Sequence, residues 1–277
     1  MPKKNRPPDK LDGDAVKAII PAAGMGTRMR PLSLAVPKEM FPVNKKPMIQ
    51  IAVEEAIFAG IMEIGIVIRK GKEIIKHYFE RLMELNEFPM VKNSSVAEKV
   101  NLHFIFQKEP LGLGNAVYSA ADFIRDSSFV MVIPDQFLIS EVPAIVQLLN
   151  AAQRQLDAVW SSIVQVCRME FKFFQGARAF LLTDRVGRVW KVAGFQNTIK
   201  DAGNLIDLGF GRTYFPAGGM DYFSEQYLNP ASGEVDLLPT FKALLKSIPN
   251  YAVLLDGRPI DLGTWVGYEH FSDQGEY

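Results

Sequence analysis

The chain has 277 residues, and its 31 lysines and arginines balance 31 aspartates and glutamates, so the formal net charge is zero. A content of 48% hydrophobic and 22% charged residues is ordinary for a globular protein and excludes a largely disordered chain. The balanced charge argues against nucleic-acid binding through a broad basic surface, and the single cysteine, Cys167, excludes an intramolecular disulfide and a cysteine zinc cluster.

The first residues of the chain, 1–14, are polar and rich in proline and lysine, which predicts a disordered arm. They lack the apolar core of a signal peptide. No stretch of the sequence approaches the roughly 18 consecutive apolar residues of a membrane span. We therefore expect a cytoplasmic protein without membrane or nucleic-acid partners.

Strand and helix patterns alternate over the first half of the chain. Short apolar runs predict buried strands over 16–21, 64–68, 102–107 and 129–133. Apolar residues at helical spacing predict helices over 46–60, 72–86 and 114–124. This alternation is typical of βαβ units and predicts an α/β fold with a buried, mainly parallel sheet.

The pattern is less regular after Asp135. Helices are predicted over 142–155 and 237–246, and strands over 158–166, 179–183, 189–192, 212–215 and 252–255. The sequence contains neither a repeat nor an interdomain linker, so we expect a single domain over 15–277, divided into a regular half, 15–135, and a mixed half, 136–277. The helix that begins at Leu237 could form a subunit contact, so the sequence leaves open whether the protein is a homo-oligomer.

A glycine-rich segment, 22–28, follows the first predicted strand. In open α/β sheets ligands bind beyond the carboxyl ends of the strands. Gly24 and Gly26 allow backbone N–H groups to approach a polyphosphate closely, and the Arg28 guanidinium can fork onto phosphate oxygens. The dinucleotide fingerprint requires a third glycine where Met29 stands, and the phosphate-loop pattern is absent as well. A plain turn is the alternative interpretation.

The wider sequence around this loop is more specific. AIIPAAGMGTR over 18–28 is followed by Pro31 and by PKEMFP over 37–42. This combination closely resembles the signature of sugar-1-phosphate nucleotidyltransferases, and the VEEA sequence over 53–56 looks most like the bacterial UTP–glucose-1-phosphate uridylyltransferases.

The resemblance implies a Rossmann-like three-layer nucleotidyltransferase fold with a mixed, mainly parallel central sheet. It also implies Mg²⁺-dependent transfer of a nucleotidyl group from a nucleoside triphosphate, UTP or dTTP, to a sugar 1-phosphate. The products would be a nucleotide sugar and pyrophosphate.

The resemblance also assigns residues to the nucleotide. The block QKEPLGLGNA over 107–116 corresponds to the family segment that contacts the edge of the base. The implied nucleotide-binding residues are Ala22, Ala23, Gly24, Gly26, Thr27, Arg28, Gln107 and Gly112. The implied catalytic residues are Arg28, Lys38 and Asp135.

Two acidic residues are the candidate metal ligands. Asp135 follows the strand 129–133, where the family has Gly-Asp-Asp; here the second acid is replaced by Gln136. Asp261 lies in PIDLGTWVGY over 259–268, which resembles the family's closing Asp-x-Gly-[TS]-x-x-Gly-Tyr block. Two carboxylates with phosphate oxygens and water suit octahedral Mg²⁺. For Asp135 alone, turn capping is the alternative.

The acceptor side departs from the family pattern. The family carries Val-Glu-Lys-Pro, whereas the corresponding segment here, VAGFQNTIK over 192–200, has no Glu-Lys pair. The candidate sugar-phosphate residues are Gly176, Asn197 and Lys200, with Gln196 and Lys191 as alternatives to the last two. A nucleotide-binding protein with weakened transfer, or an enzyme with an acceptor other than glucose 1-phosphate, therefore stays open.

Overall fold

The computed structural model describes residues 16–85, 87, 100–174, 179–196, 204–225, 228–229 and 233–273. The predicted polar arm, 1–14, lies outside these residues. So do the candidate acceptor residues Gly176, Asn197 and Lys200.

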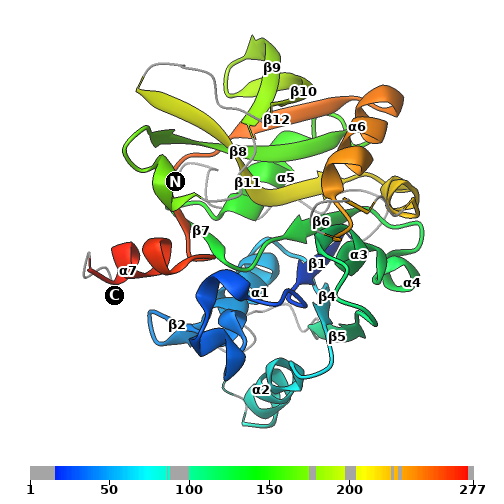
Figure 1. Ribbon diagram of the computed structural model, residues 1–277. Coiled ribbons are helices and arrows are strands. Elements are labelled where there is room, and N and C mark those ends of the chain that lie inside the picture. The colour runs from blue at the N-terminus through cyan, green and yellow to red at the C-terminus, as the bar shows by residue number, and fades with distance from the viewer. Residues whose placement is uncertain are drawn as a thin grey trace.

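A nine-stranded sheet runs through the molecule, from β5 at the bottom of Figure 1 to β9 at the top. Its strand order is β5-β4-β1-β6-β11-β8-β12-β10-β9. The strands are β1 (Lys17–Pro21), β4 (Glu63–Ile68), β5 (Asn101–Phe106), β6 (Phe129–Val132), β8 (Val159–Cys167), β9 (Ala179–Val186), β10 (Val189–Gln196), β11 (Leu205–Phe215) and β12 (Asn250–Leu254).

The sheet is mixed and mainly parallel, as predicted. β5, β4, β1 and β6 pair in parallel, and so do β8 and β12. β11 is antiparallel to both β6 and β8, and β10 is antiparallel to both β12 and β9. Across these pairings only β11 and β10 oppose the common direction. Strands of both predicted halves thus share one sheet, while the boundary of the domain stays a prediction.

Helices cover both faces of the sheet and complete three layers (Figure 1). Neighbouring residues of β1 point to opposite faces, because side chains alternate along a strand. Ala18 and Ile20 pack with α1 (Met48–Phe58), α2 (Glu73–Glu84) and α5 (Ala144–Ala152). Ile19 packs on the other side with α3 (Leu113–Tyr118), α4 (Ala121–Ile124) and α6 (Leu237–Ser247). Among the described helices, none is long and apolar enough to cross a membrane.

The helix predicted over 114–124 is wrong in one respect, because it is divided into α3 and α4. At the break, the Ser119 hydroxyl donates to the Asn115 carbonyl at 2.9 Å, and Ala120 adopts a φ of −94° and a ψ of 11°. Serine side chains that bond to the preceding turn compete with the helix backbone. The short helix α3 consequently stays close to the glycines that precede it.

The sequence patterns also missed several short elements. These are the antiparallel pair β7 (Gln136–Ile139) and β13 (Arg258–Asp261), the hairpin β2 (Pro42–Val43) and β3 (Lys46–Pro47), and α7 (Trp265–Asp273). The strand predicted over 212–215 is the end of the longer β11. Such short strands carry too few residues to show a period of two.

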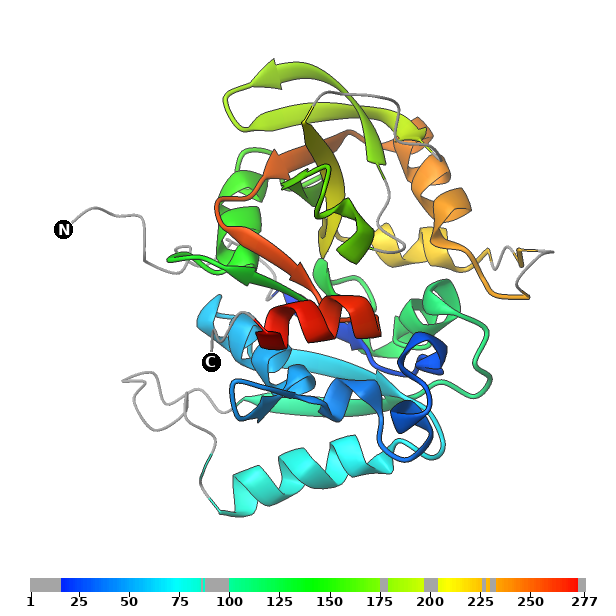
Figure 2. The same ribbon diagram turned by 60° about the vertical axis from the view of Figure 1, so that its left-hand side comes forward.

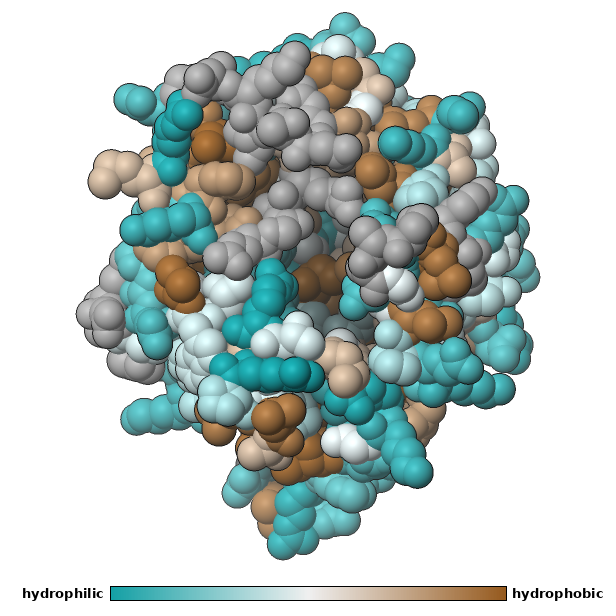
Figure 3. Space-filling view, viewed as in Figure 1, coloured by the Kyte–Doolittle hydropathy of each residue, from teal (hydrophilic) through white to brown (hydrophobic). Residues whose placement is uncertain are grey.

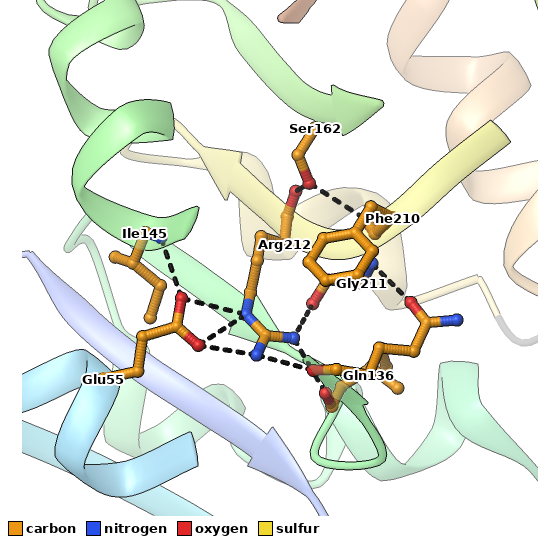
Figure 4. A network of polar contacts seen from close by, with 8 residues as sticks. Glu55, Gln136, Ile145, Ser162, Phe210, Gly211 and Arg212 are labelled. Atoms are coloured by element: carbon orange, nitrogen blue, oxygen red, sulfur yellow. Dashed lines mark hydrogen bonds and ion pairs between the residues drawn. The ribbon is translucent and has the colours of Figure 1, made fainter. Parts of the chain in front are cut away.

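A buried ion pair joins elements from both halves of the chain (Figure 4). The Arg212 side chain on β11 is fully buried, and its Nη2 lies 2.6 Å from Oε2 of Glu55 on α1. The same guanidinium donates to the carbonyl oxygens of Ile133 at 2.9 Å and Gln136 at 2.8 Å. Oε1 of Glu55 accepts the N–H of Ile145 at the start of α5 at 2.9 Å. One charge pair therefore fixes α1, α5, β11 and the β6–β7 connection.

Replacing Glu55→Gln is expected to lower the free energy of unfolding by about 3–5 kcal/mol, because it leaves the buried Arg212 charge without its partner. Urea denaturation measures this change. The matched control is Arg81→Gln, which breaks an exposed pair with Glu84 and should cost less than about 1 kcal/mol. Equal losses in the two variants would contradict the role of the ion pair.

Candidate active site

The carboxyl ends of four neighbouring parallel strands define the site. β6, β1, β4 and β5 end side by side, so the segments that follow them meet at one edge of the sheet. A cavity of about 530 Å³ lies there, and Figure 3 shows the surface hollowed near the middle of this face. Its lining includes the predicted residues Ala23, Gly24, Gly26, Thr27, Arg28, Lys38, Gln107, Gly112, Asp135 and Asp261. Ala22, the first residue of the loop, is fully buried and does not line the cavity.

The glycine-rich loop turns sharply at Gly26. This residue has a φ of +65°, which favours glycine, and its carbonyl accepts the Ser33 hydroxyl at 2.7 Å and the Met29 N–H at 2.9 Å. A Cβ at Gly26 would lie 3.1 Å from the Cβ of Ser33. Residues 27–29 form a short 3-10 turn. The helix that a dinucleotide fingerprint needs at this point therefore does not form.

The second nucleotide block is held by both halves of the chain. Gln107 is buried, and its Nε2 donates to Oδ1 of Asn115 at 2.8 Å. Gly112 has a φ of +92°, and a Cβ there would lie 2.8 Å from the Cβ of Glu234. The N–H of Val235 donates to the Leu111 carbonyl at 2.5 Å. A segment from the second half thus packs directly against this block and leaves room only for glycine.

Lys38 and Asp135 form an ion pair inside the cavity. Both side chains are largely buried. Burial lowers the pKa of Lys38, but the negative charges of Asp135 and Glu39 and the hydrogen bond to Asp135 together outweigh burial, so the pKa lies above its ordinary value. Burial raises the pKa of Asp135, and the charge and hydrogen bond of Lys38 bring it below the ordinary value. The pair is therefore charged on both sides at neutral pH.

Asp261 approaches the same point from the second half of the chain. The β7–β13 pairing places Asp261 opposite Gln136, whose Nε2 donates to Oδ2 of Asp261 at 3.0 Å. The N–H of Gly263 donates to Oδ1 at 2.9 Å. Burial first, and then the negative charge of Asp135, raise the pKa of Asp261 to about 6. A neighbouring positive charge would restore its ionised form.

The two carboxylates fit a small divalent cation. A Cβ at Gly263 would lie 2.8 Å from Oδ2 of Asp135 and 3.0 Å from Oδ1 of Asp261, so both oxygens converge on one place. Within the described residues, no group of three or more His, Cys, Asp or Glu side chains forms a metal site. Mg²⁺ prefers few carboxylates and retains positions for phosphate oxygens and water.

The last helix fastens this carboxylate to the nucleotide loop. Nε1 of Trp265 donates to the Arg30 carbonyl at 2.8 Å, and the Tyr268 hydroxyl donates to the Pro42 carbonyl at 2.8 Å. Phe271 packs in one apolar cluster with Met29 and Phe41. Figure 2 shows α7, in red, beside the blue segment that follows β1. The closing block of the sequence therefore completes the site through packing as well as through Asp261.

Sequence reasoning missed three supporting residues at the site: Glu39 and Lys72, which are buried, and Gln136, which is half-buried. Lys72 follows β4, which neighbours β1 in the sheet. Its position just after a strand was the feature of the sequence that could have placed it near the site. Gln136 was counted only as the loss of an acid, yet its amide holds Asp261. Lys191, one alternative for the acceptor phosphate, is exposed on β10 and does not line the cavity.

The sequence profile of the Nucleotidyl transferase family matches residues 17–170. The chain therefore belongs to the nucleotidyl transferase family. It is 35% identical over 263 residues to UTP--glucose-1-phosphate uridylyltransferase 2 of Staphylococcus saprophyticus, with 91% of this chain and 89% of the relative covered. It is also 35% identical to UTP--glucose-1-phosphate uridylyltransferase of Bacillus subtilis, over 91% of this chain and 88% of that protein.

Solved structures share the fold. A UDP-glucose pyrophosphorylase complexed with UDP-glucose superposes with a TM-score of 0.78 at 24% identity, covering 94% of this chain and 98% of the other. A UTP-bound UGPase from Acinetobacter baumannii has a TM-score of 0.74 at 24% identity, with 94% and 93% covered. The Rossmann-like nucleotidyltransferase fold is thereby confirmed.

The raised pKa of Asp261 predicts how stability depends on pH in EDTA. The folded-state value of about 6 lies above the ordinary value of 3.8, so the folded protein binds an extra proton between these values. Binding of this proton stabilises the folded protein. The stabilisation is fully present below the ordinary pKa and is lost as pH rises through about 6. Relative to Asp261→Asn, the free energy of unfolding of the unaltered protein should fall by up to about 3 kcal/mol from about pH 4 to about pH 7.

Urea denaturation at each pH measures this difference. The control Asp256→Asn replaces an exposed aspartate outside the cavity lining and should follow the unaltered protein throughout. If the unfolding free energies of Asp261→Asn and of the unaltered protein changed in parallel with pH, a raised pKa of Asp261 would be ruled out.

Proposed function

We propose that the protein transfers the uridylyl group of UTP to a sugar 1-phosphate, with glucose 1-phosphate as the first acceptor to test and dTTP as an alternative donor. One observation supports this proposal most strongly. The glycine-rich loop, Lys38 and the two aspartates, Asp135 and Asp261, line a single cavity. The names of the curated relatives support the choice of UTP and glucose 1-phosphate.

In this proposal the nucleotide lies over the ends of β1 and β5. Ala23 and Gly24 follow the base and ribose, with the buried Ala22 supporting them from below, while Gln107 and Gly112 contact the base edge. A carboxamide supplies both a donor and an acceptor to a pyrimidine. The triphosphate rests on Gly26, Thr27 and Arg28, where exposed backbone N–H groups and a guanidinium suit phosphate oxygens.

The reaction requires no general base. A phosphate oxygen of the sugar 1-phosphate is already ionised near neutral pH. It forms a bond to the α-phosphorus of the nucleoside triphosphate, the bond from that phosphorus to the bridging oxygen breaks, and pyrophosphate leaves with the electron pair. Lys38 and Arg28 orient the reacting phosphates and stabilise the charge that develops on their oxygens.

Asp135 and Asp261 would hold Mg²⁺. The ion supplies Lewis-acid stabilisation of phosphate oxygens when it is bound. The chain's own contribution is to keep both carboxylates at one place. Gln136 and Gly263 orient Asp261, and the N–H of Leu262 donates to the Asp135 carbonyl at 2.8 Å.

The segment expected to bind the acceptor suggests a second candidate function. Since residues 192–200 lack the Glu-Lys pair that the family uses for the sugar phosphate, the pocket can suit a different phosphorylated acceptor or leave a protein that binds nucleotide with weakened transfer. These alternatives differ in a single assay.

Pyrophosphate release with Mg²⁺, each nucleoside triphosphate and a panel of sugar 1-phosphates tests the function. We expect release with UTP and at least one acceptor. Lys38→Ala and Asp135→Ala should abolish it, because the first removes a positive charge that stabilises the reacting phosphates and the second removes a proposed ligand of Mg²⁺. The matched control Lys46→Ala, which breaks a half-exposed pair with Glu54, should retain it.

Each outcome points to one interpretation. Release with an acceptor other than glucose 1-phosphate indicates a changed acceptor pocket. UTP binding without release from any pair would favour the nucleotide-binding protein. Release that persists in Lys38→Ala or Asp135→Ala would show that the site is elsewhere.

A further inference from the structure

A buried lysine lies directly beneath the two segments that form the nucleotide site. Lys72 follows β4, and only 3% of its surface is exposed. Its Nζ donates to the Ala22 carbonyl at 2.8 Å and to Oε2 of Glu39 at 2.7 Å. Ala22 belongs to the glycine-rich loop, and Glu39 is the residue after Lys38. One ammonium group therefore touches both segments.

We propose that Lys72 is a positioning residue for nucleotidyl transfer, which sets the place of Lys38 relative to the glycine-rich loop. The inference rests on the proposed function. Lys72 does not itself line the cavity, and its described contacts do not include Asp135, so it acts through Glu39, which does line the cavity, and through Ala22. Charges of alternating sign run from Asp135 through Lys38 and Glu39 to Lys72.

Lys72 holds the one acidic side chain of the short turn that carries Lys38. Residues 38–40 form a single 3-10 turn, which has few backbone bonds of its own. Glu39 is only 1% exposed, and its carboxylate points into the protein toward Lys72. Fixing Glu39 consequently fixes the backbone from which Lys38 extends to Asp135.

Stability alone does not account for this pair. Burial lowers the pKa of Lys72 below its ordinary value, although the charge of Glu39 raises it. Removing two charges from water costs several kcal/mol per ion, and a well-packed apolar pair is often as stable. An ammonium does what an apolar side chain cannot: it holds a carbonyl of one loop and a carboxylate of another in one geometry.

The test is a double-mutant cycle on UTP affinity in the presence of Mg²⁺, measured by isothermal titration calorimetry. Lys38→Ala and Lys72→Met should each weaken UTP binding about tenfold, roughly the effect of one charge-assisted hydrogen bond. If Lys72 acts through Lys38, the double variant should bind UTP within about threefold of Lys38→Ala alone. Losses that multiply in the double variant would overturn the proposal.

A second comparison separates positioning from folding. Lys72→Met leaves Glu39 buried without a partner and should destabilise the protein, whereas Lys72→Met combined with Glu39→Gln removes both charges. We expect the combined variant to regain most of the unfolding free energy in urea while its UTP affinity and kcat stay at least about tenfold low. Recovery of affinity together with stability would show a purely structural role.

Lys17→Met is the matched control. Its Nζ also donates to a backbone carbonyl, that of Phe123 at 2.6 Å, but at the opposite end of β1. UTP affinity and kcat should stay within about twofold of the unaltered protein, as expected for sites without shared partners. Because UTP binding is measured apart from pyrophosphate release, a protein that binds UTP without transfer would refute the proposed function while still testing the role of Lys72.

Discussion

The ion pair between Glu55 and Arg212 is the constraint on which the active site depends. The guanidinium donates to the carbonyls of Ile133 and Gln136, which lie on either side of Asp135 in the chain. The backbone that carries this aspartate is therefore held at both ends by one buried charge. Since Glu55 also accepts the N–H of Ile145 in the first turn of α5, the helices α1 and α5 are fixed with it. A buried charge pair is stable only in a narrow range of geometries. The backbone that carries Asp135 is therefore restricted to a narrow range of positions as well.

The same network explains the residue that replaces the family's second acid. The Gln136 amide donates to Asp261 at 3.0 Å and accepts the N–H of Gly211 at 2.7 Å. A carboxylate at this position has no proton to donate at neutral pH and would add a third negative charge beside Asp135 and Asp261. Gly211 is required as well, because a Cβ there would lie 2.5 Å from the Cβ of Ile133. The departure from the motif is thus compensated within the fold.

Local patterns predicted most of the long elements but missed α7 and the short strands. Buried strands such as 64–68 and amphipathic helices such as 72–86 carry enough residues for a clear period. β7 and β13 are four residues each, and their pairing with one another helps to bring Asp261 to the site. At the break between α3 and α4 a serine hydroxyl bonds to the preceding turn, and hydrophobic spacing does not report such a bond.

The sequence by itself determined the βα alternation, the glycine-rich loop and the two aspartates, because each of these is written in contiguous residues or at a strand end. Only the tertiary structure decided which side chains support them. Lys72 reaches Ala22 and Glu39 because β4 lies beside β1, and Arg212 reaches Glu55 because β11 pairs with β6 behind α1. A charged side chain is buried without a large energetic cost only when a partner lies within hydrogen-bond distance. For these residues the partner is distant in sequence, and the strand order brings the two together. No local periodicity in the sequence reports that proximity.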